Sequence, residues 1–152
     1  PVFIDNCIGR AFDGIGELLP LMDVLIASAD FPRSLTGIDD PRASLAELQR
    51  LFGCPVAGVT LGDSGSVVLG PEGLVETPAY PVPGGCRDTT GAGDAYRVGF
   101  LYGLLTGRSI EQSSRMANGV AALKCRAIGA RTSLPTAAEL NDLVGSENRR
   151  SE

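Results

Sequence analysis

The sequence predicts an α/β fold in which a mostly parallel sheet is flanked by helices. Short apolar runs alternate along the chain with segments of helical periodicity, as in strands joined by crossover helices. These runs are continuous and do not alternate with polar residues, which is typical of strands covered on both faces. A length of 152 residues is sufficient for one compact domain. We therefore predict one α/β domain over residues 1–145, followed by a polar tail over 146–152.

The first half of the chain supplies the predicted strands. The helix expected at 41–52 is the clearest element, because Pro41 lies in its first turn, Leu45 and Leu48 share one face, and Gly53 ends it. An apolar strand that begins at residue 2 needs a pairing partner, so we expect the chain to be the later part of a longer protein and to aggregate when isolated. The elements expected here are strands at 2–5, 23–27 and 56–61, helices at 30–35 and 41–52, and a hairpin of strands at 66–69 and 74–76.

The second half of the chain is predicted to be helical. After a Pro- and Gly-rich connector at 78–85, helices are expected at 91–105, 110–126 and 137–144. The last two begin with capping boxes, in which a hydroxyl side chain and an acid or amide three residues later satisfy the orphan amides of the helix start. These boxes are Ser109-Ile-Glu-Gln112 and Thr136-Ala-Ala-Glu139, and the polar residues from 145 onward are expected to fray.

The composition excludes several classes of protein. A formal net charge of −5 disfavours a protein that coats nucleic acid, and the absence of histidine removes His-dependent triads and His-ligated zinc. No apolar run is long enough to cross a membrane. The cysteines form no Cys-x-x-Cys pair and are expected to be small core residues in a reduced compartment, which makes a cytoplasmic protein the default; they are Cys7, Cys54, Cys86 and Cys125.

The most informative segment is DTTGAGDAY at residues 88–96. A Gly-x-Gly entering a helix exposes backbone amides at the positive end of the helix dipole, which is an anion site in principle, although such residues also simply cap helices. A Walker loop is excluded because no lysine follows these glycines, and a dinucleotide fingerprint is excluded because Tyr96 stands where the third glycine is required. The remaining interpretation is phosphoryl transfer, with Asp94 accepting a proton from a hydroxyl beside a bound phosphate.

This nonapeptide resembles the C-terminal signature of the ribokinase family, the PfkB-type carbohydrate kinases. Residues 60–65 (TLGDSG) and 129–135 (GARTSLP) support the resemblance at family-like spacing, and it extends over nearly all of the chain. It implies a ribokinase-like, Rossmann-like fold of which this chain is the C-terminal, nucleotide-binding portion. It also implies ATP-dependent phosphorylation of a sugar or nucleoside hydroxyl in the cytoplasm by a full-length protein that forms a homodimer.

The resemblance assigns roles to individual residues. Asp94 is the implied base, and the amides of Gly91, Ala92 and Gly93 form the implied anion hole for the transferred phosphoryl group. The implied contacts to the nucleotide are Thr60, Gly62 and Gly65, with Asn118 beside the adenine. The implied site for a monovalent cation such as K⁺ consists of Asp88, Ser133 and the carbonyls near Gly129.

Each assignment has a simpler alternative. Thr60 and Gly62 can merely end a strand, Asp88 can be only a cap, and Asn118 can be a surface helix residue. The family also shows Asn-x-x-Glu, which organises water around Mg²⁺, where this chain has Ser28-Ala29-Asp30-Phe31. Asp30 is the only acid close to that position. The alternatives to a kinase are a non-catalytic protein that keeps the fold and binds nucleotide or a partner, and, less favoured because of Tyr96, part of an NAD-dependent oxidoreductase.

Overall fold

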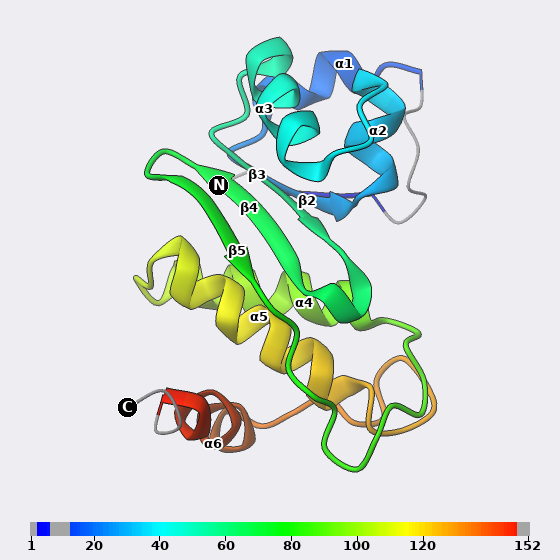
Figure 1. The fold of residues 1–152 in the computed structure, drawn as a ribbon, viewed down its shortest axis with the longest axis vertical. Coiled ribbons are helices and arrows are strands. Elements are labelled where there is room, and N and C mark those ends of the chain that lie inside the picture. The colour runs from blue at the N-terminus through cyan, green and yellow to red at the C-terminus, as the bar shows by residue number, and fades with distance from the viewer. Residues whose placement is uncertain (1–2, 7–12, 149–152) are drawn as a thin grey trace. The chain divides into compact units, whose positions relative to one another are not determined.

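The computed structural model describes residues 3–6 and 13–148, with side chains described for 13–145. The chain divides into two compact units, Pro1–Glu76 and Thr77–Glu152, and each unit is described by itself. The first unit contains the sheet and its covering helices, and the second contains three helices and the loops between them (Figure 1).

The sheet of the first unit is mixed, so the prediction of a mostly parallel sheet is wrong. Its five strands lie in sequence order, with β1 beside β2 and β2 beside β3 in parallel, and β3 beside β4 antiparallel. The short loop at 61–65 joins β3 directly to β4, and a connection of that length joins only antiparallel neighbours. The strands are β1 (Phe3–Asn6), β2 (Val24–Ser28), β3 (Val56–Thr60), β4 (Ser66–Gly70) and β5 (Gly73–Thr77).

Helices connect the parallel strands and cover one face of the sheet. The helices α1 (Ile15–Leu18) and η1 (Leu19–Leu21) lead into β2, and α2 (Asp30–Thr36) and α3 (Pro41–Phe52) lead into β3. The buried side chains of this layer form one cluster, which includes Leu25, Val59, Val67, Phe31, Leu45 and Leu48. Burying such side chains contributes roughly 1.5–3 kcal/mol each. This cluster therefore holds β2 and β3, whose ends carry the candidate site residues of this unit.

The bounds of α3 agree with its prediction. The Asp40 carboxylate accepts a hydrogen bond from the Ala43 amide at 2.9 Å, Pro41 occupies the first helical position, and Gly53 ends the helix with a φ of +71°. The structure adds α1 and η1, which the sequence analysis did not identify. The prediction of a strand at 2–5 is confirmed for residues 3–5, and residue 2 lies outside the described residues.

The second unit is built on a close crossing of two helices, α4 (Ala92–Leu105) and α5 (Ile110–Lys124). A Cβ atom added at Gly99 would lie 2.8 Å from Ala117 Cα, and one added at Gly103 would lie 2.8 Å from Ser113 Cα. Glycine at these two positions therefore lets the helix axes approach more closely than any side chain would allow. The crossing fixes the direction of α4, whose first turn carries the DTTGAGDAY motif.

The third helix, α6 (Ala137–Asn148), packs on α5 at Gly119, where an added Cβ would lie 2.8 Å from Leu140 Cδ1. Both capping boxes are confirmed, the first by Ser109 and Gln112 and the second by Thr136 and Glu139. The expected fraying from residue 145 is wrong as far as Asn148, because α6 continues to that residue, and 149–152 lie outside the described residues. No helix of the described chain is long and apolar enough to cross a membrane.

Candidate active site

The start of α4 presents backbone amides, as the motif predicts. Gly91 precedes the helix with a φ of +78°, a conformation that favours glycine. The Ala92 amide donates to the Thr89 carbonyl at 3.0 Å, so one of the three amides assigned to the anion hole is already engaged in a turn. Within the described residues, the Gly91 and Gly93 amides donate to no protein group. These two N–H groups at the positive end of a 14-residue helix remain suited to an anion.

The carboxylate of Asp94 lies in the first turn of α4 and faces solvent. Its side chain is 63% exposed, and its Oδ1 accepts a hydrogen bond from Arg97 Nη1 at 2.9 Å. The Arg97 side chain is only 11% exposed and passes alongside Gly93. Asp94 is therefore not enclosed in a dry interior ion pair, and its carboxylate is accessible to a substrate. The sequence analysis missed Arg97, although an acid and an arginine three positions apart on a helix are neighbours.

The carboxylate of Asp88 is held by hydrogen bonds from two segments. Its Oδ1 accepts from the Thr90 amide at 2.9 Å, and its Oδ2 accepts from the Gly129 amide at 2.7 Å. These bonds, led by that of Gly129, lower the pKa of Asp88 from 3.8 to about 2. The link to Gly129, 41 positions away in sequence, shows that Asp88 is more than a local cap.

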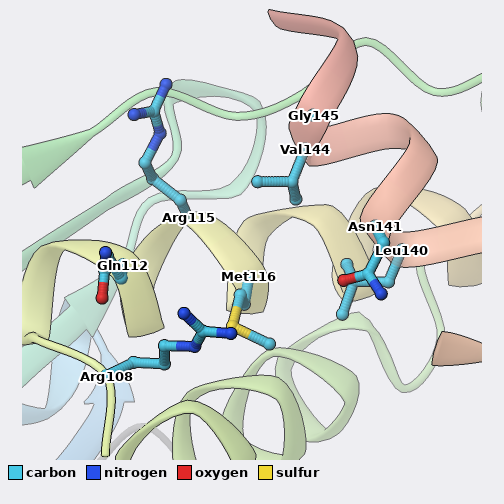
Figure 2. Close-up of a pocket in the computed structure, with 8 residues that line it drawn as sticks. All are labelled: Arg108, Gln112, Arg115, Met116, Leu140, Asn141, Val144 and Gly145. Atoms are coloured by element: carbon cyan, nitrogen blue, oxygen red, sulfur yellow. The ribbon is translucent and has the colours of Figure 1, made fainter. Parts of the chain in front are cut away.

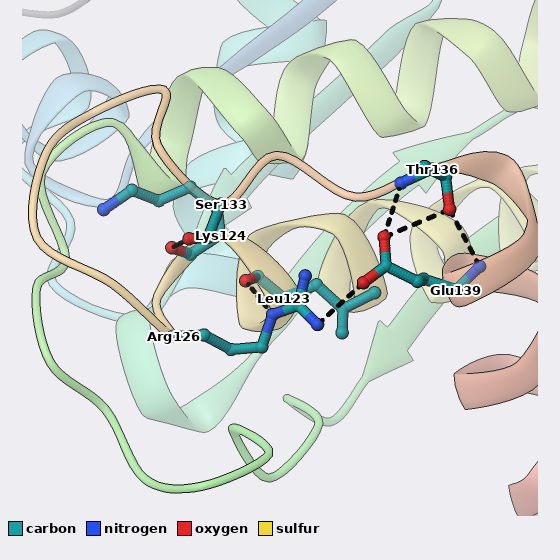
Figure 3. A network of polar contacts seen from close by, with 6 residues as sticks. All are labelled: Leu123, Lys124, Arg126, Ser133, Thr136 and Glu139. Atoms are coloured by element: carbon teal, nitrogen blue, oxygen red, sulfur yellow. Dashed lines mark hydrogen bonds and ion pairs between the residues drawn. The ribbon is translucent and has the colours of Figure 1, made fainter.

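Lys124, the last residue of α5, connects the other members of this cluster. Its ammonium group donates to the Asp88 carbonyl at 2.7 Å, and its side chain is fully buried. The Ser133 hydroxyl donates to the Lys124 carbonyl, as Figure 3 shows. The same view shows Arg126 between the Leu123 carbonyl and Glu139, which ties the end of α5 to the capping box of α6. The sequence analysis did not assign any role to Lys124.

The predicted cation ligands are thus brought together, but their polar groups already bind one another. Asp88 is bonded to Gly129, and both Asp88 and Ser133 are bonded to Lys124. Among the described residues, no group of three or more acidic or cysteine side chains that could hold a metal ion is found. The site for a monovalent cation therefore stays a prediction, and no step of the chemistry below depends on K⁺.

The loop at 61–65 in the first unit carries the other predicted phosphate contacts. Thr60 ends β3, and the loop closes on itself through the Leu61 amide, which donates to the Gly65 carbonyl at 2.8 Å. Gly62 and Gly65 have φ values of +62° and +96°. The backbone of Gly65, with ψ near −126°, lies in a region that essentially only glycine occupies. The strand end is confirmed, whereas contacts from this loop to a nucleotide stay a prediction.

Asn118 lies on α5 and is only 5% exposed, so the interpretation as a surface helix residue is wrong. Its Nδ2 donates to the Thr77 carbonyl at 3.2 Å.

The structure also shows which residue occupies the position of the expected magnesium-organising acid. Phe31 stands there, fully buried in the core of the first unit, while the neighbouring Asp30 is an exposed residue of the first turn of α2. These residues do not supply the acid that the family pattern provides for Mg²⁺, and no step is derived through that ion.

A separate cavity of about 300 Å³ lies between α5 and α6 (Figure 2). It is lined by residues of the first half of α5, such as Gln112 and Met116, and by Leu140 and Val144 of α6. Lys124 is at the opposite end of α5, so this cavity is not part of the Asp88 cluster. Arg108 and Arg115 also line it, but their guanidinium groups point to different sides in Figure 2 and do not converge on one ligand position.

The architecture and the motif together resemble those of ribokinase-like proteins. The chain superposes on Arabidopsis thaliana ribokinase complexed with ribose and ATP with a TM-score of 0.84 and 26% identity, covering 95% of this chain and 47% of that one. Residues 1–137 match the pfkB family of carbohydrate kinases. The chain therefore belongs to this family.

Two relatives show the range of the similarity. An uncharacterised sugar kinase of Archaeoglobus fulgidus is 43% identical over 84 residues, which is 55% of this chain and 33% of that protein. An ATP-dependent 6-phosphofructokinase of Thermoanaerobacterium thermosaccharolyticum is 34% identical over 131 residues, which is 83% of this chain and 39% of that protein. The chain thus spans well under half of the length of these relatives.

Proposed function

We propose that the chain is the nucleotide-binding part of an ATP-dependent kinase that phosphorylates a hydroxyl group of a sugar or nucleoside. The observation that carries this proposal is the first turn of α4. There, two amides without a protein partner among the described residues lie next to an accessible carboxylate. Anion-binding donors beside a proton acceptor are the two elements that in-line phosphoryl transfer requires of the protein.

The proposed chemistry assigns one task to each group. Asp94 accepts the proton of the acceptor hydroxyl, whose oxygen attacks the γ-phosphorus while the bond to the β–γ bridging oxygen breaks and ADP leaves. The amides of Gly91 and Gly93 stabilise the charge on the transferred phosphoryl oxygens, and the helix dipole of α4 adds to their effect. Arg97 orients the Asp94 carboxylate through its hydrogen bond of 2.9 Å.

The remaining predicted residues are assigned to the nucleotide. In this proposal Thr60, Gly62 and Gly65 follow the phosphates and ribose, since a glycine loop allows close approach of the backbone to a ligand. Asn118, whose side chain donates a hydrogen bond to the Thr77 carbonyl, lies beside the adenine in this proposal. The acceptor is a sugar or nucleoside, and a homodimer of the full-length protein is the proposed assembly.

The test is Asp94→Asn in the full-length protein. Turnover is expected to fall about 100-fold or more, as for loss of a general base, while binding of ATP persists. Glu111→Gln is the matched control, because it removes one exposed carboxylate from the first turn of the neighbouring helix α5. Phosphate transfer from ATP to a panel of sugars and nucleosides is measured for both variants. Equal turnover in Asp94→Asn and in the unaltered protein would remove Asp94 from the mechanism.

A second candidate is a protein of this family that binds nucleotide without catalysis. It is favoured by Phe31, a buried aromatic residue at the position of the expected magnesium-organising acid. Binding of ATP by the full-length protein, without phosphorylation of any acceptor in the same panel, would support this candidate over the kinase.

A further inference from the structure

Two free thiols meet beside the anion-binding motif. Cys86 lies two positions before Asp88, and Cys125 directly follows Lys124, the only lysine of the chain and the last residue of α5. Both are free cysteines of the second unit. The Cys125 thiol donates a hydrogen bond to the Cys86 sulfur, so the two sulfur atoms already face each other. The proposed phosphoryl transfer uses neither thiol.

Hydrogen bonds on either side of the thiols hold the two cysteines together. The amide of Arg87, the residue after Cys86, donates to the Cys125 carbonyl at 2.8 Å. The Lys124 ammonium group donates to the Asp88 carbonyl at 2.7 Å. The segment that begins at Cys86 is therefore already fixed to the end of α5 at two points. A disulfide requires such an arrangement, because cysteines whose Cα atoms lie more than about 7 Å apart cannot be bridged without movement of the backbone.

The two thiols differ in exposure. Cys86 is exposed, so its sulfur is accessible to a reagent in solution, whereas Cys125 is only 6% exposed. Burial, and after it the neighbouring Cys86, raises the pKa of Cys125. The pair therefore consists of one thiol that meets an oxidant first and a second, sheltered thiol within reach of the first. Cys54, by contrast, is buried in the first unit and donates to the Val56 carbonyl at 3.3 Å.

We propose that Cys86 and Cys125 form a reversible disulfide by exchange with a low-molecular-weight disulfide, and that this bond locks the segment before α4 onto the end of α5. The locked segment includes Asp88, whose carboxylate bonds to the amides of Thr90 and Gly129 and so shapes the approach to the anion-binding turn. The inference goes beyond the proposed function and does not depend on it, because the disulfide forms whether or not the protein transfers phosphate.

The exchange proceeds in two balanced steps, written here for glutathione disulfide. The Cys86 thiolate attacks one sulfur of glutathione disulfide, the S–S bond of that molecule breaks, and one glutathione leaves and takes up the proton that Cys86 has released. The Cys125 sulfur then attacks the Cys86 sulfur of the mixed disulfide, and the second glutathione leaves with the proton of Cys125. The two cysteines together lose two electrons, and glutathione disulfide is reduced to two thiols.

The test exposes the folded full-length protein to glutathione disulfide, blocks the remaining thiols with N-ethylmaleimide and maps the peptides by mass spectrometry without reduction. A cross-linked peptide pair that contains Cys86 and Cys125 is expected, and dithiothreitol is expected to separate it. The Tm of the oxidised protein is expected to exceed that of the reduced protein by about 5 °C or more, because a cross-link that closes a long loop restricts the unfolded chain. Thiols that stay reduced, a glutathione adduct that persists on Cys86 alone, or a cross-link that does not raise the Tm would overturn the proposal.

Three variants make the result specific. Cys86→Ser is expected to lose both the cross-link and the rise in Tm, whereas Cys54→Ala, the matched control, keeps the pair and is expected to retain both. In Cys125→Ala, glutathione is expected to accumulate on Cys86, since no second thiol displaces it. If Cys125→Ala does not fold, the exposed position of Cys86 makes Cys86→Ser decisive by itself. Neither readout needs ATP or an acceptor, and Asp94→Asn is expected to form the same disulfide, so failure of this inference and failure of the kinase proposal are distinguishable.

Discussion

Two glycine-containing segments, one in each unit, carry candidate site residues, and they hold their shapes in different ways. The loop at 61–65 closes through its own backbone, with the Leu61 amide bonded to the Gly65 carbonyl. The segment at 88–93 is held by distant residues, since Asp88 is bonded to Gly129 and to Lys124. The first shape is therefore a local property of the five residues 61–65. The second depends on the C-terminal end of α5 and on the loop that follows it.

Glycine is required for different reasons at Gly62 and at Gly91. A Cβ at Gly62 would meet nothing within 4 Å, so glycine is needed there only for its φ of +62°. Gly91 also has a positive φ, but a Cβ there would lie 3.0 Å from Ala130 Cβ and 3.1 Å from its carbonyl oxygen. Conformation alone selects glycine in the first segment, whereas conformation and packing both select it in the second.

The largest effect expected from this comparison is on stability. Gly62→Ala is predicted to lower the free energy of unfolding by about 1 kcal/mol through left-handed backbone strain. Gly91→Ala is predicted to cost about 2 kcal/mol or more, because displacing the loop at Ala130 adds to the same strain. Urea unfolding of the two variants measures the difference. Equal costs would show that the loop at 129–132 yields freely and that the packing distinction is wrong.

A second prediction concerns pH and applies only to the segment held by distant residues. The folded pKa of Asp88 lies at about 2, below its ordinary value of 3.8, so its contribution to stability is present above about pH 4 and is lost as the pH falls toward 2. Asp88→Asn is expected to remove part of the fall in stability over this window. Urea midpoints between pH 2 and 5 provide the measurement.

The control for this pH prediction is Asp142→Asn, which removes an exposed carboxylate of α6. It is expected to leave the pH profile of the unaltered protein in place. A profile for Asp88→Asn that parallels the unaltered protein throughout would mean that the hydrogen bonds from Gly129 and Thr90 do not favour the ionised form of Asp88.

The smallest expected effect is a difference in the rate of alkylation among the cysteines near the two segments. Cys54, before β3, is 1% exposed, and Cys125, at the end of α5, is 6% exposed; burial raises the pKa of both thiols. Cys86 is exposed, so the expectation that the cysteines are core residues holds for only two of these three.

Iodoacetamide at pH 8 is predicted to label Cys86 at least about tenfold faster than the other two. Peptide mass mapping identifies each site, including Cys7, which lies outside the described residues. Labelling of Cys125 as fast as Cys86 would show that the end of α5 opens readily.

Local signals explain which parts of the fold were predictable. The bounds of α3 follow from Pro41 and Gly53, and both capping boxes follow from residues three positions apart. The elements α1 and η1 were missed because they span only 4 and 3 residues, too short to show a helical period. The mixed sheet was missed because the apolar run of β3 resembles that of the parallel strand β2, and only its pairing with β4 distinguishes it.

In the candidate site, too, features set by contiguous residues were predictable, and features set by residues far apart in the sequence were not. The DTTGAGDAY motif predicts an anion-binding helix start because its glycines, Asp94 and the helix are contiguous in sequence. The engagement of the Ala92 amide in a turn and the burial of Lys124 were not predictable, since both depend on coordinates of the backbone or on residues tens of positions away. Pair interactions of this kind leave no periodic or compositional signal in a single sequence.

The burial of the single lysine has a practical consequence for handling this chain. Reagents that attach dyes, biotin or cross-linkers to lysine side chains have no exposed lysine to modify, because every other cationic side chain is an arginine. Enzymes that acetylate or ubiquitinate lysine face the same obstacle as long as α5 stays folded. Conjugation through the exposed thiol of Cys86 is the practical alternative, and lysine modification instead becomes a sensitive indicator of unfolding at the end of α5.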